Sequence, residues 1–309
     1  MKANVQKKKI TGNGFLLLIT IALFVVMYVA GMIVFADKGF AKPQMFLNLF
    51  VSNAGLLVIA CGLTIVMITG GIDISVGSVT ALVCMVLADL MENKGVNAYA
   101  AVLVALLIGV AFGIVQGFLV AYLDIQPFIV TLAGMFFGRG LTAIISTDMI
   151  SIKNKTFLAW ANYKIYLPIG SYSRRGKFIP AYIYPTVIIA ILIFIVILDG
   201  LLAGCGGFLF CLNSCSGFVE QAKGLEMDAI SASVIGGTLL SGGVGTPFGT
   251  VFGVLIKGTI SSLITTQGTL SSWWVRIALS ALLCFFIVLR ALSCMTSVTC
   301  RCLFVFLLK

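Results

Sequence analysis

The sequence predicts an all-α, polytopic integral membrane protein with roughly eight to ten transmembrane helices. Hydrophobic residues make up 61% of the 309 residues and charged residues only 10%, with a mean hydropathy of +1.16. Soluble domains are closer to half apolar and a quarter charged. Long apolar runs follow one another along the whole chain, and glycine-rich stretches interrupt several of them. We therefore expect some broken or short helices within a single membrane-spanning domain over residues 1–309.

The individual helices follow from the apolar runs, because a membrane span needs about 20 mainly apolar residues. These runs lie at 15–36, 48–69, 76–91, 98–123, 128–146, 180–198, 201–219, 229–240, 247–265 and 270–293, with a weak run at 302–308. Several are too short or too rich in glycine to cross by themselves. Trp273 and Trp274 with Arg276 indicate an interfacial anchor.

Basic residues set the expected topology. Lys2, Lys7, Lys8 and Lys9 make residues 1–14 a basic segment, which predicts a cytoplasmic N-terminus. A signal peptide would have an apolar core of about 7–15 residues, and the run at 15–36 is longer, so we favour an uncleaved first helix. The longest extramembrane loop is predicted at 147–179. It is rich in Lys, Arg and aromatic residues, and it is long enough to be translocated regardless of its charge.

The charge and the cysteines exclude other classes of function. The net charge of +10 comes from residues that flank apolar runs, which indicates a lipid bilayer as partner and no nucleic acid. Nine cysteines are scattered through apolar runs, and the chain contains no histidine. Their spacing matches no CxxC pattern. We predict packing roles for them, and no metal site or cofactor.

A carboxylate among glycines is the most informative local feature. Asp73 lies in the stretch ITGGIDISVGS at 68–78, between two apolar runs, and a charge at that depth needs protein or water around it. Arg139 and Lys257, also in apolar runs, either pair with Asp73 or extend to the interface. The pattern of 70–77 recurs at 236–243, which predicts two pseudo-repeated halves with broken helices.

Other polar residues in the apolar runs favour passage of a solute. Hydroxyl, amide and carboxylate groups can replace the water around a polyol such as a sugar. The expected residues are Asn53, Thr64, Thr69, Asp73, Ser75, Ser78, Gln116 and Thr131, although a hydroxyl can instead bond its own helix.

Catalysis is not expected. The stretch LSGG at 240–243 is like the signature loop of an ATPase, but no GxxxxGK[ST] phosphate-binding loop occurs. Glu226 and Asp228 are two residues apart and do not share a helix face. The absence of histidine removes the commonest general base.

Four stretches together resemble a known family. They are 68–78, PFIVTLAGMFFGRG at 127–140, EMDAISASVIGGTLLSGGVGTPFG at 226–249 and GTLSSWWVR at 268–276. They are similar to permease subunits of bacterial importers driven by ATP-binding cassettes, in the ribose-type monosaccharide group, with galactofuranose-uptake permeases most alike. The resemblance implies an inner-membrane subunit that works with ATPase subunits, a second permease (identical or not) and a periplasmic sugar-binding protein. It also implies that the glycine-rich segments, including Gly70, Gly71, Gly77, Gly236, Gly237 and Ser241, line or brace the sugar path.

One departure from that family concerns energy coupling. Members carry a cytoplasmic loop that docks on the ATPase before the motif of Glu226 and Asp228, two residues with possible coupling or structural roles. Here 197–198 runs through Asp199 and Gly200 directly into the next apolar run, so this loop is expected to be missing. Asp-Gly is a turn dipeptide, which suits a tight hairpin.

Three functions remain open at this point. The first is a working permease subunit. The second is a coupling-deficient or inactive membrane scaffold derived from such a permease. Binding of the ATPase to this chain would argue against it. The third is a secondary transporter that uses Asp73 as its protonatable site. Its uptake would persist without ATP and collapse with an uncoupler.

Overall fold

The computed structural model describes residues 2–172, 178–187, 190, 199–269, 271 and 273–295. The longer helices are α1 (Lys2–Val34), α2 (Pro43–Ile68), α3 (Val76–Glu92), α4 (Ala98–Ala121), α5 (Pro127–Ile145), α8 (Asp199–Ser214), α10 (Pro247–Gln267) and α11 (Trp273–Met295). Two shorter helices are α6 (Lys155–Asn162) and α9 (Leu225–Ile235), and the strands are β1 (Ile150–Ser151), β2 (Ile165–Tyr172), β3 (Phe178–Ile183) and β4 (Ser216–Gly217). The predicted helical fold is confirmed, with two small sheets added.

Five helices are long and apolar enough to cross a membrane within the described residues. They are Leu16–Val34, Pro43–Ile68, Ala98–Ala121, Pro127–Ile145 and Pro247–Gln267, and the apolar part of α11, Trp273–Leu289, is shorter. The chain is thus a polytopic membrane protein. The total of eight to ten crossings stays a prediction, because α3, α8 and α9 are shorter than a full span and 191–198 lies outside the described residues.

Local sequence explains where the long helices begin. Pro43, Pro127 and Pro247 each occupy the first turn of α2, α5 and α10, where the missing N–H costs no hydrogen bond. The side chain of Thr246 caps α10 by accepting from the N–H of Gly249 at 3.2 Å. Asn97 caps α4 in the same way through the N–H of Tyr99. These residues set the helix starts independently of packing.

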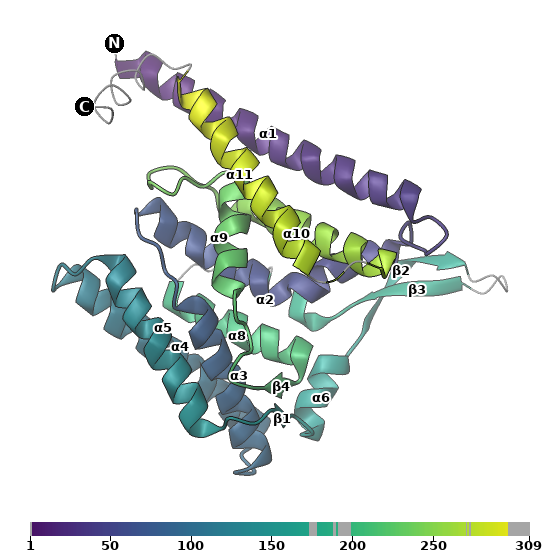
Figure 1. Cartoon of the computed structure of the whole chain (residues 1–309). Coiled ribbons are helices and arrows are strands. Elements are labelled where there is room, and N and C mark those ends of the chain that lie inside the picture. Colours follow the sequence, from purple (N-terminus) through teal and green to yellow (C-terminus); the bar gives the residue numbers. More distant parts are fainter. Residues whose placement is uncertain are drawn as a thin grey trace.

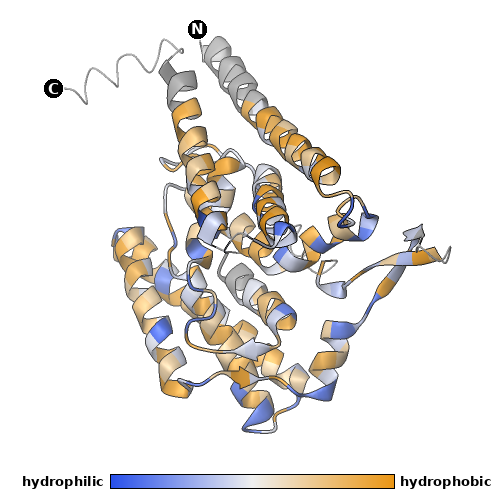
Figure 2. Cartoon of the chain, turned by 45° about the vertical axis from the view of Figure 1, so that its right-hand side comes forward, coloured by the Kyte–Doolittle hydropathy of each residue, from blue (hydrophilic) through white to orange (hydrophobic). Residues whose placement is uncertain are grey.

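The core forms around α2, which is the most buried of the five long helices. It packs against α8, α9 and α10, while α3 joins α8 to α4 and α5. Figure 1 shows α1 and α11 beside α10 on one side and α4 and α5 on the other. In Figure 2 the ribbons of α4, α5 and the coloured part of α1 are mainly in the colour of hydrophobic residues. Such an outward apolar surface suits lipid or another membrane subunit.

Small residues allow the closest helix contacts. A Cβ added to Gly236, at the end of α9, would lie 2.5 Å from the backbone nitrogen of Thr250 on α10. A Cβ on Gly55 of α2 would lie 3.0 Å from the carbonyl oxygen of Gly206 on α8. Backbones approach this closely in membrane proteins only where the side chains are small.

Hydroxyl groups join α2, α9 and α10 in the middle of the core. The Thr64 hydroxyl lies 2.6 Å from the hydroxyl of Thr250 and donates to that of Ser233 at 3.0 Å, and all three residues are buried. Thr64 also bonds Ala60 of its own helix. Of the two roles expected for Thr64, the structure shows the bond within its own helix and adds contacts with two neighbouring helices, whereas a role in solute passage stays a prediction.

Three sequence boundaries need correction. The run expected as a span at 180–198 begins as strand β3, which pairs antiparallel with β2. The loop at 147–179 is largely regular, because it contains β1, α6 and β2, with 173–177 outside the described residues. The run at 229–240 is the helix α9, which starts at Leu225 and ends at Ile235.

Candidate functional site

The two glycine-rich segments meet in space. The N–H of Gly243, in the connection between α9 and α10, donates to the carbonyl of Ile68 at the end of α2 at 2.8 Å. A Cβ on Gly242 would lie 2.7 Å from the Cα of Gly70. We call the contact of residues 68–71 with 236–245 the glycine junction. It connects segments that are about 170 positions apart in the sequence.

Both helices that enter the glycine junction end in the same way. α2 ends at Ile68 and is followed by Gly70 with φ +87°, while α9 ends at Ile235 and is followed by Gly237 with φ +104°. The N–H groups of Gly70 and Gly237 each donate at 3.0 Å three residues back, and the N–H groups that follow donate five residues back. This is the Schellman ending, which favours glycine.

The matching ends of α2 and α9 shift the alignment of the repeated pattern by one residue. The recurring pattern aligns Gly70 with Gly236, whereas the backbone aligns Gly70 with Gly237, one residue later. Two helices with matching ends and joined loops support the expected relation between the halves. The relation itself stays a prediction.

Beside the junction, Asp73 organises the start of α3. Its carboxylate accepts from the N–H of Ser75 at 2.8 Å and from the Ser75 hydroxyl at 2.7 Å. The Gln116 amide of α4 lies 3.1 Å from the same hydroxyl, and Ser78 donates back to the carbonyl of Ser75 at 2.7 Å. Ser75 and Ser78 are buried. We call Asp73, Ser75, Ser78 and Gln116 the Asp73 cluster.

Helix α5 closes the other side of the Asp73 cluster. The Thr131 hydroxyl donates to the carbonyl of Ile72 at 3.2 Å. A Cβ on Gly138 would lie 2.9 Å from the Ser78 hydroxyl, and one on Gly134 would overlap the Gln116 amide. These glycines bring α5 against polar groups. The chemistry on offer is hydrogen bonding by hydroxyl, amide and carboxylate, which suits a polyol.

Other predicted positions lie elsewhere. Asn53 is buried in α2, donates to the carbonyl of Leu49 at 2.8 Å, and faces Gly258 of α10. Its role in the structure is therefore helix packing. Thr69 is exposed and bonds its own helix through the carbonyl of Val66. Ser241 is exposed in the glycine junction.

Gly71 and Gly77 flank the Asp73 cluster. Gly71 is buried at the base of the extended stretch before α3. Gly77 lies in the first turn of α3, and a Cβ there would overlap the carboxylate of Glu226. Asp199 is the first residue of α8, and its side chain lies outside the described part.

Of the two expectations for Arg139 and Lys257, pairing with Asp73 was wrong. Arg139 donates to the carbonyls of Val219 and Gln221, and Lys257 pairs with Asp228 at 3.2 Å. The sequence could not reveal the first arrangement, because backbone carbonyls carry no residue-type signal. The second joins α9 to α10, so Asp228 has a structural contact there.

An open groove runs between α4 and α5, with a volume of about 320 Å³. Its walls are apolar apart from Gln116, and they include Phe112, Val115 and Phe137. Apolar walls offer a polar solute few hydrogen bonds, and the polar side chain among them, Gln116, also belongs to the Asp73 cluster. Among the described residues no cluster of potential ligands could hold a metal ion.

Comparison with known proteins identifies the family. The profile of the family described as "Branched-chain amino acid transport system / permease component" matches residues 45–199 and 184–288. The chain belongs to this family. No solved structure matches the permease.

Curated relatives cover most of the permease. It is 37% identical to the inner membrane ABC transporter permease protein YjfF of Escherichia coli, over 89% of this chain and 91% of the relative. It is 28% identical to the fructose import permease protein FruG of Bifidobacterium longum, over 93% and 96%. It is 29% identical to the autoinducer 2 import system permease protein LsrC of Yersinia pestis, over 82% and 79%.

Proposed function

We propose that this chain is the membrane-spanning subunit of an ATP-driven importer that moves a monosaccharide, ribose-like or galactofuranose-like, across a bacterial inner membrane. The observation that carries the proposal is the glycine junction, where Gly243 bonds Ile68 directly beside the Asp73 cluster. Relatives named as ABC and fructose import permeases support the class of transporter and solute. ATP hydrolysis would belong to separate subunits.

The residues suggest how a sugar would pass. Hydroxyls of Ser75 and Ser78 and the amide of Gln116 both donate and accept, so they can exchange partners with sugar hydroxyls at little net cost. Asp73 fixes Ser75 through two hydrogen bonds. Because Gly243 is bonded to the end of α2, a movement of the connection between α9 and α10 reaches the Asp73 cluster without an intermediate side chain.

The partners follow from the same proposal. Two ATPase subunits would act from the cytoplasmic side, and a periplasmic binding protein would deliver the sugar. The outward apolar face of α4 and α5, with Ile114 66% and Ile144 81% exposed, is available to lipid or to a second permease. Whether that second permease is identical is open.

The test is uptake by proteoliposomes that contain the purified chain, its ATPase and its binding protein. Asp73→Asn removes the charge but keeps an oxygen that can accept from Ser75. We expect uptake of labelled ribose or galactofuranose to fall about tenfold or more, as for loss of a charge-assisted hydrogen bond. The matched control, Asp148→Asn, changes an exposed loop carboxylate and should leave uptake unaltered.

Other outcomes would revise the proposal. Uptake that continues without ATP and collapses with an uncoupler would favour a secondary transporter that uses Asp73. Uptake of neither sugar by wild type, with another hexose transported, would retain the class and change the substrate. Equal uptake by Asp73→Asn and wild type would remove the Asp73 cluster from the path.

A second candidate is a coupling-deficient permease. The family match falls into two pieces that overlap at 184–199, at the place where the coupling loop is expected to be missing. Detergent pull-down with the ATPase would compare this chain with a version given a family-type loop between Asp199 and Gly200. Retention by both versions supports a working importer, and retention by the extended version only supports the coupling-deficient reading.

A further inference from the structure

Residues 218–224, between β4 and α9, form an irregular segment whose position depends on contacts with side chains. Ala222 has φ +59° and Gly224 has φ +86°, and for alanine the left-handed conformation is unfavourable. The backbone bonds within the segment are short-range turns, such as the N–H of Gln221 to the carbonyl of Phe218. A carbonyl oxygen of Ala222 approaches Gly77, so the segment lies against the first turn of α3.

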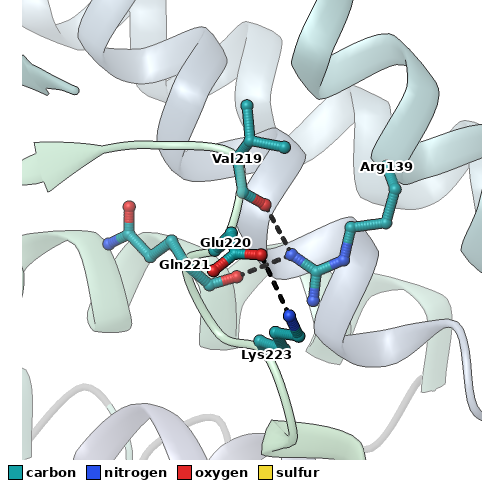
Figure 3. Close-up of polar contacts among 5 residues, drawn as sticks. All are labelled: Arg139, Val219, Glu220, Gln221 and Lys223. Atoms are coloured by element: carbon teal, nitrogen blue, oxygen red, sulfur yellow. Dashed lines mark hydrogen bonds and ion pairs between the residues drawn. The ribbon is translucent and has the colours of Figure 1, made fainter. Parts of the chain in front are cut away.

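Arg139 of α5 holds this segment from the other side. Its Nη1 donates to the carbonyl of Val219 at 2.7 Å and to that of Gln221 at 2.9 Å (Figure 3). Within the described part of the chain, its Nε and Nη2 have no hydrogen-bond partner. The neighbouring Glu220 bonds to Lys223 at 2.9 Å instead.

Glu226, in the first turn of α9, is a second possible partner for Arg139. Its Oε2 is buried and has no hydrogen-bond partner among the described residues. A Cβ on Gly77 would overlap the Glu226 carboxylate and lie 3.0 Å from the carbonyl oxygen of Ala222, so this carboxylate lies against the same 218–224 segment that Arg139 holds. An unsatisfied buried carboxylate oxygen beside a guanidinium with unused donors is a pair ready to form.

We propose that Arg139 is a positioning residue that alternates between two partners. In the present conformation it clasps the carbonyls of Val219 and Gln221 and fixes the 218–224 segment against α3. In the other conformation the guanidinium turns so that both terminal nitrogens pair with the Glu226 carboxylate; Nη1 then leaves the carbonyls of Val219 and Gln221, and the segment is released. That this exchange serves the transport cycle rests on the proposed function, whereas the exchange itself does not.

Hydrogen–deuterium exchange of the purified chain in nanodiscs tests the clasp without sugar, ATPase or transport. Arg139→Gln should raise the amide exchange rate across 218–224 by about fivefold or more, because the clasp is lost. Arg139→Lys should restore part of the protection, since an ammonium can donate to both carbonyls. Glu226→Gln should lower the rate, because the released conformation loses its ion pair.

The two substitutions are expected to change the exchange rate of 218–224 in opposite directions, and this separates the proposal from its alternatives. A static charge cluster predicts that Arg139→Gln and Glu226→Gln both raise the rate, and that result, or no change in Arg139→Gln, overturns the proposal. In the double variant, Glu226→Gln should have no further effect beyond Arg139→Gln. A persistent lowering there would instead indicate a local bond made by the new amide, and would also overturn it.

The matched control is Arg276→Gln. Arg276 is a cation near Gly224 that stacks on Trp273 at 5.1 Å, and it donates no hydrogen bond to the described part of the segment. Its exchange profile across 218–224 should equal that of wild type. Size-exclusion profiles of all variants establish that each one folds. These measurements need no transport. Exchange data that overturn the Arg139 proposal therefore leave the importer proposal intact, and an absence of uptake leaves the Arg139 proposal testable.

Discussion

Replacing Thr64 by valine tests how much the buried hydroxyl contacts stabilise the core. The substitution keeps the shape of the side chain and removes two contacts between helices, to Thr250 at 2.6 Å and to Ser233 at 3.0 Å. Ser233 keeps its bond to Ala229, and Thr250 keeps its bond to Thr246, so neither hydroxyl is left without a partner. Hydrogen bonds between membrane helices contribute about 0.6 kcal/mol on average and up to about 1.7 kcal/mol.

The expected loss of stability is therefore about 1–3 kcal/mol for the two contacts. Thr259→Val is the matched control, because Thr259 is equally buried on α10 but bonds only the carbonyl of Leu255 on its own helix. Both variants lose one bond within a helix and gain a methyl group, so their difference isolates the contacts between helices. Reversible unfolding in SDS and detergent mixtures measures it. A difference below about 0.5 kcal/mol would refute the reasoning, since it is less than one average contact.

Two further predictions address the site and the pairing of β3 with β2. Gly77→Ala should lower stability and uptake, because its Cβ would overlap the Glu226 carboxylate and lie 3.0 Å from the carbonyl oxygen of Ala222. Gly117→Ala, with open space around it, should behave as wild type, and normal behaviour of both variants in size exclusion and uptake would contradict the close contact. Gln44→Leu should speed amide exchange over 180–183, because the Gln44 side chain accepts from the N–H of Tyr182 at 2.8 Å and donates to its carbonyl at 3.1 Å. Asn48→Ala, which removes only a neighbouring bond of Gln44, should change that exchange little, and equal effects of the two variants would count against the anchor.

The sequence located the polar part of the site but not its geometry. Asp73, Ser75 and Gln116 stood out because polar groups in apolar runs are costly and need a reason to be there. Their mutual contacts depend on α4 and α5 returning beside α3, and no local pattern encodes that. Gly134 and Gly138 illustrate the gap, since a glycine shows where backbones can approach but not which group lies opposite.

Arg139 and strand β3 were missed for different reasons. The partners of Arg139 are carbonyls, which every residue has, so the sequence offered only Asp73 or the membrane interface for it. The run beginning at Pro180 is apolar and aromatic, and periodicity cannot separate a short strand of that composition from the start of a helix. Both errors arose where the deciding contact was with backbone.

The length of α9 has a consequence for what can pass. Its 11 residues extend only about 16 Å, roughly half of a hydrocarbon core about 30 Å thick, so a helix of this length that enters the core has one end within it. If that end is the N-terminus, its macrodipole would attract an anion, but Glu226 and Asp228 in the first turn supply negative charge there. The positive end of the helix macrodipole is thereby offset by side chains of α9 itself. Because Lys257 pairs with Asp228 at 3.2 Å, one of these two carboxylates is itself offset, and the start of α9 presents little net charge to a passing solute.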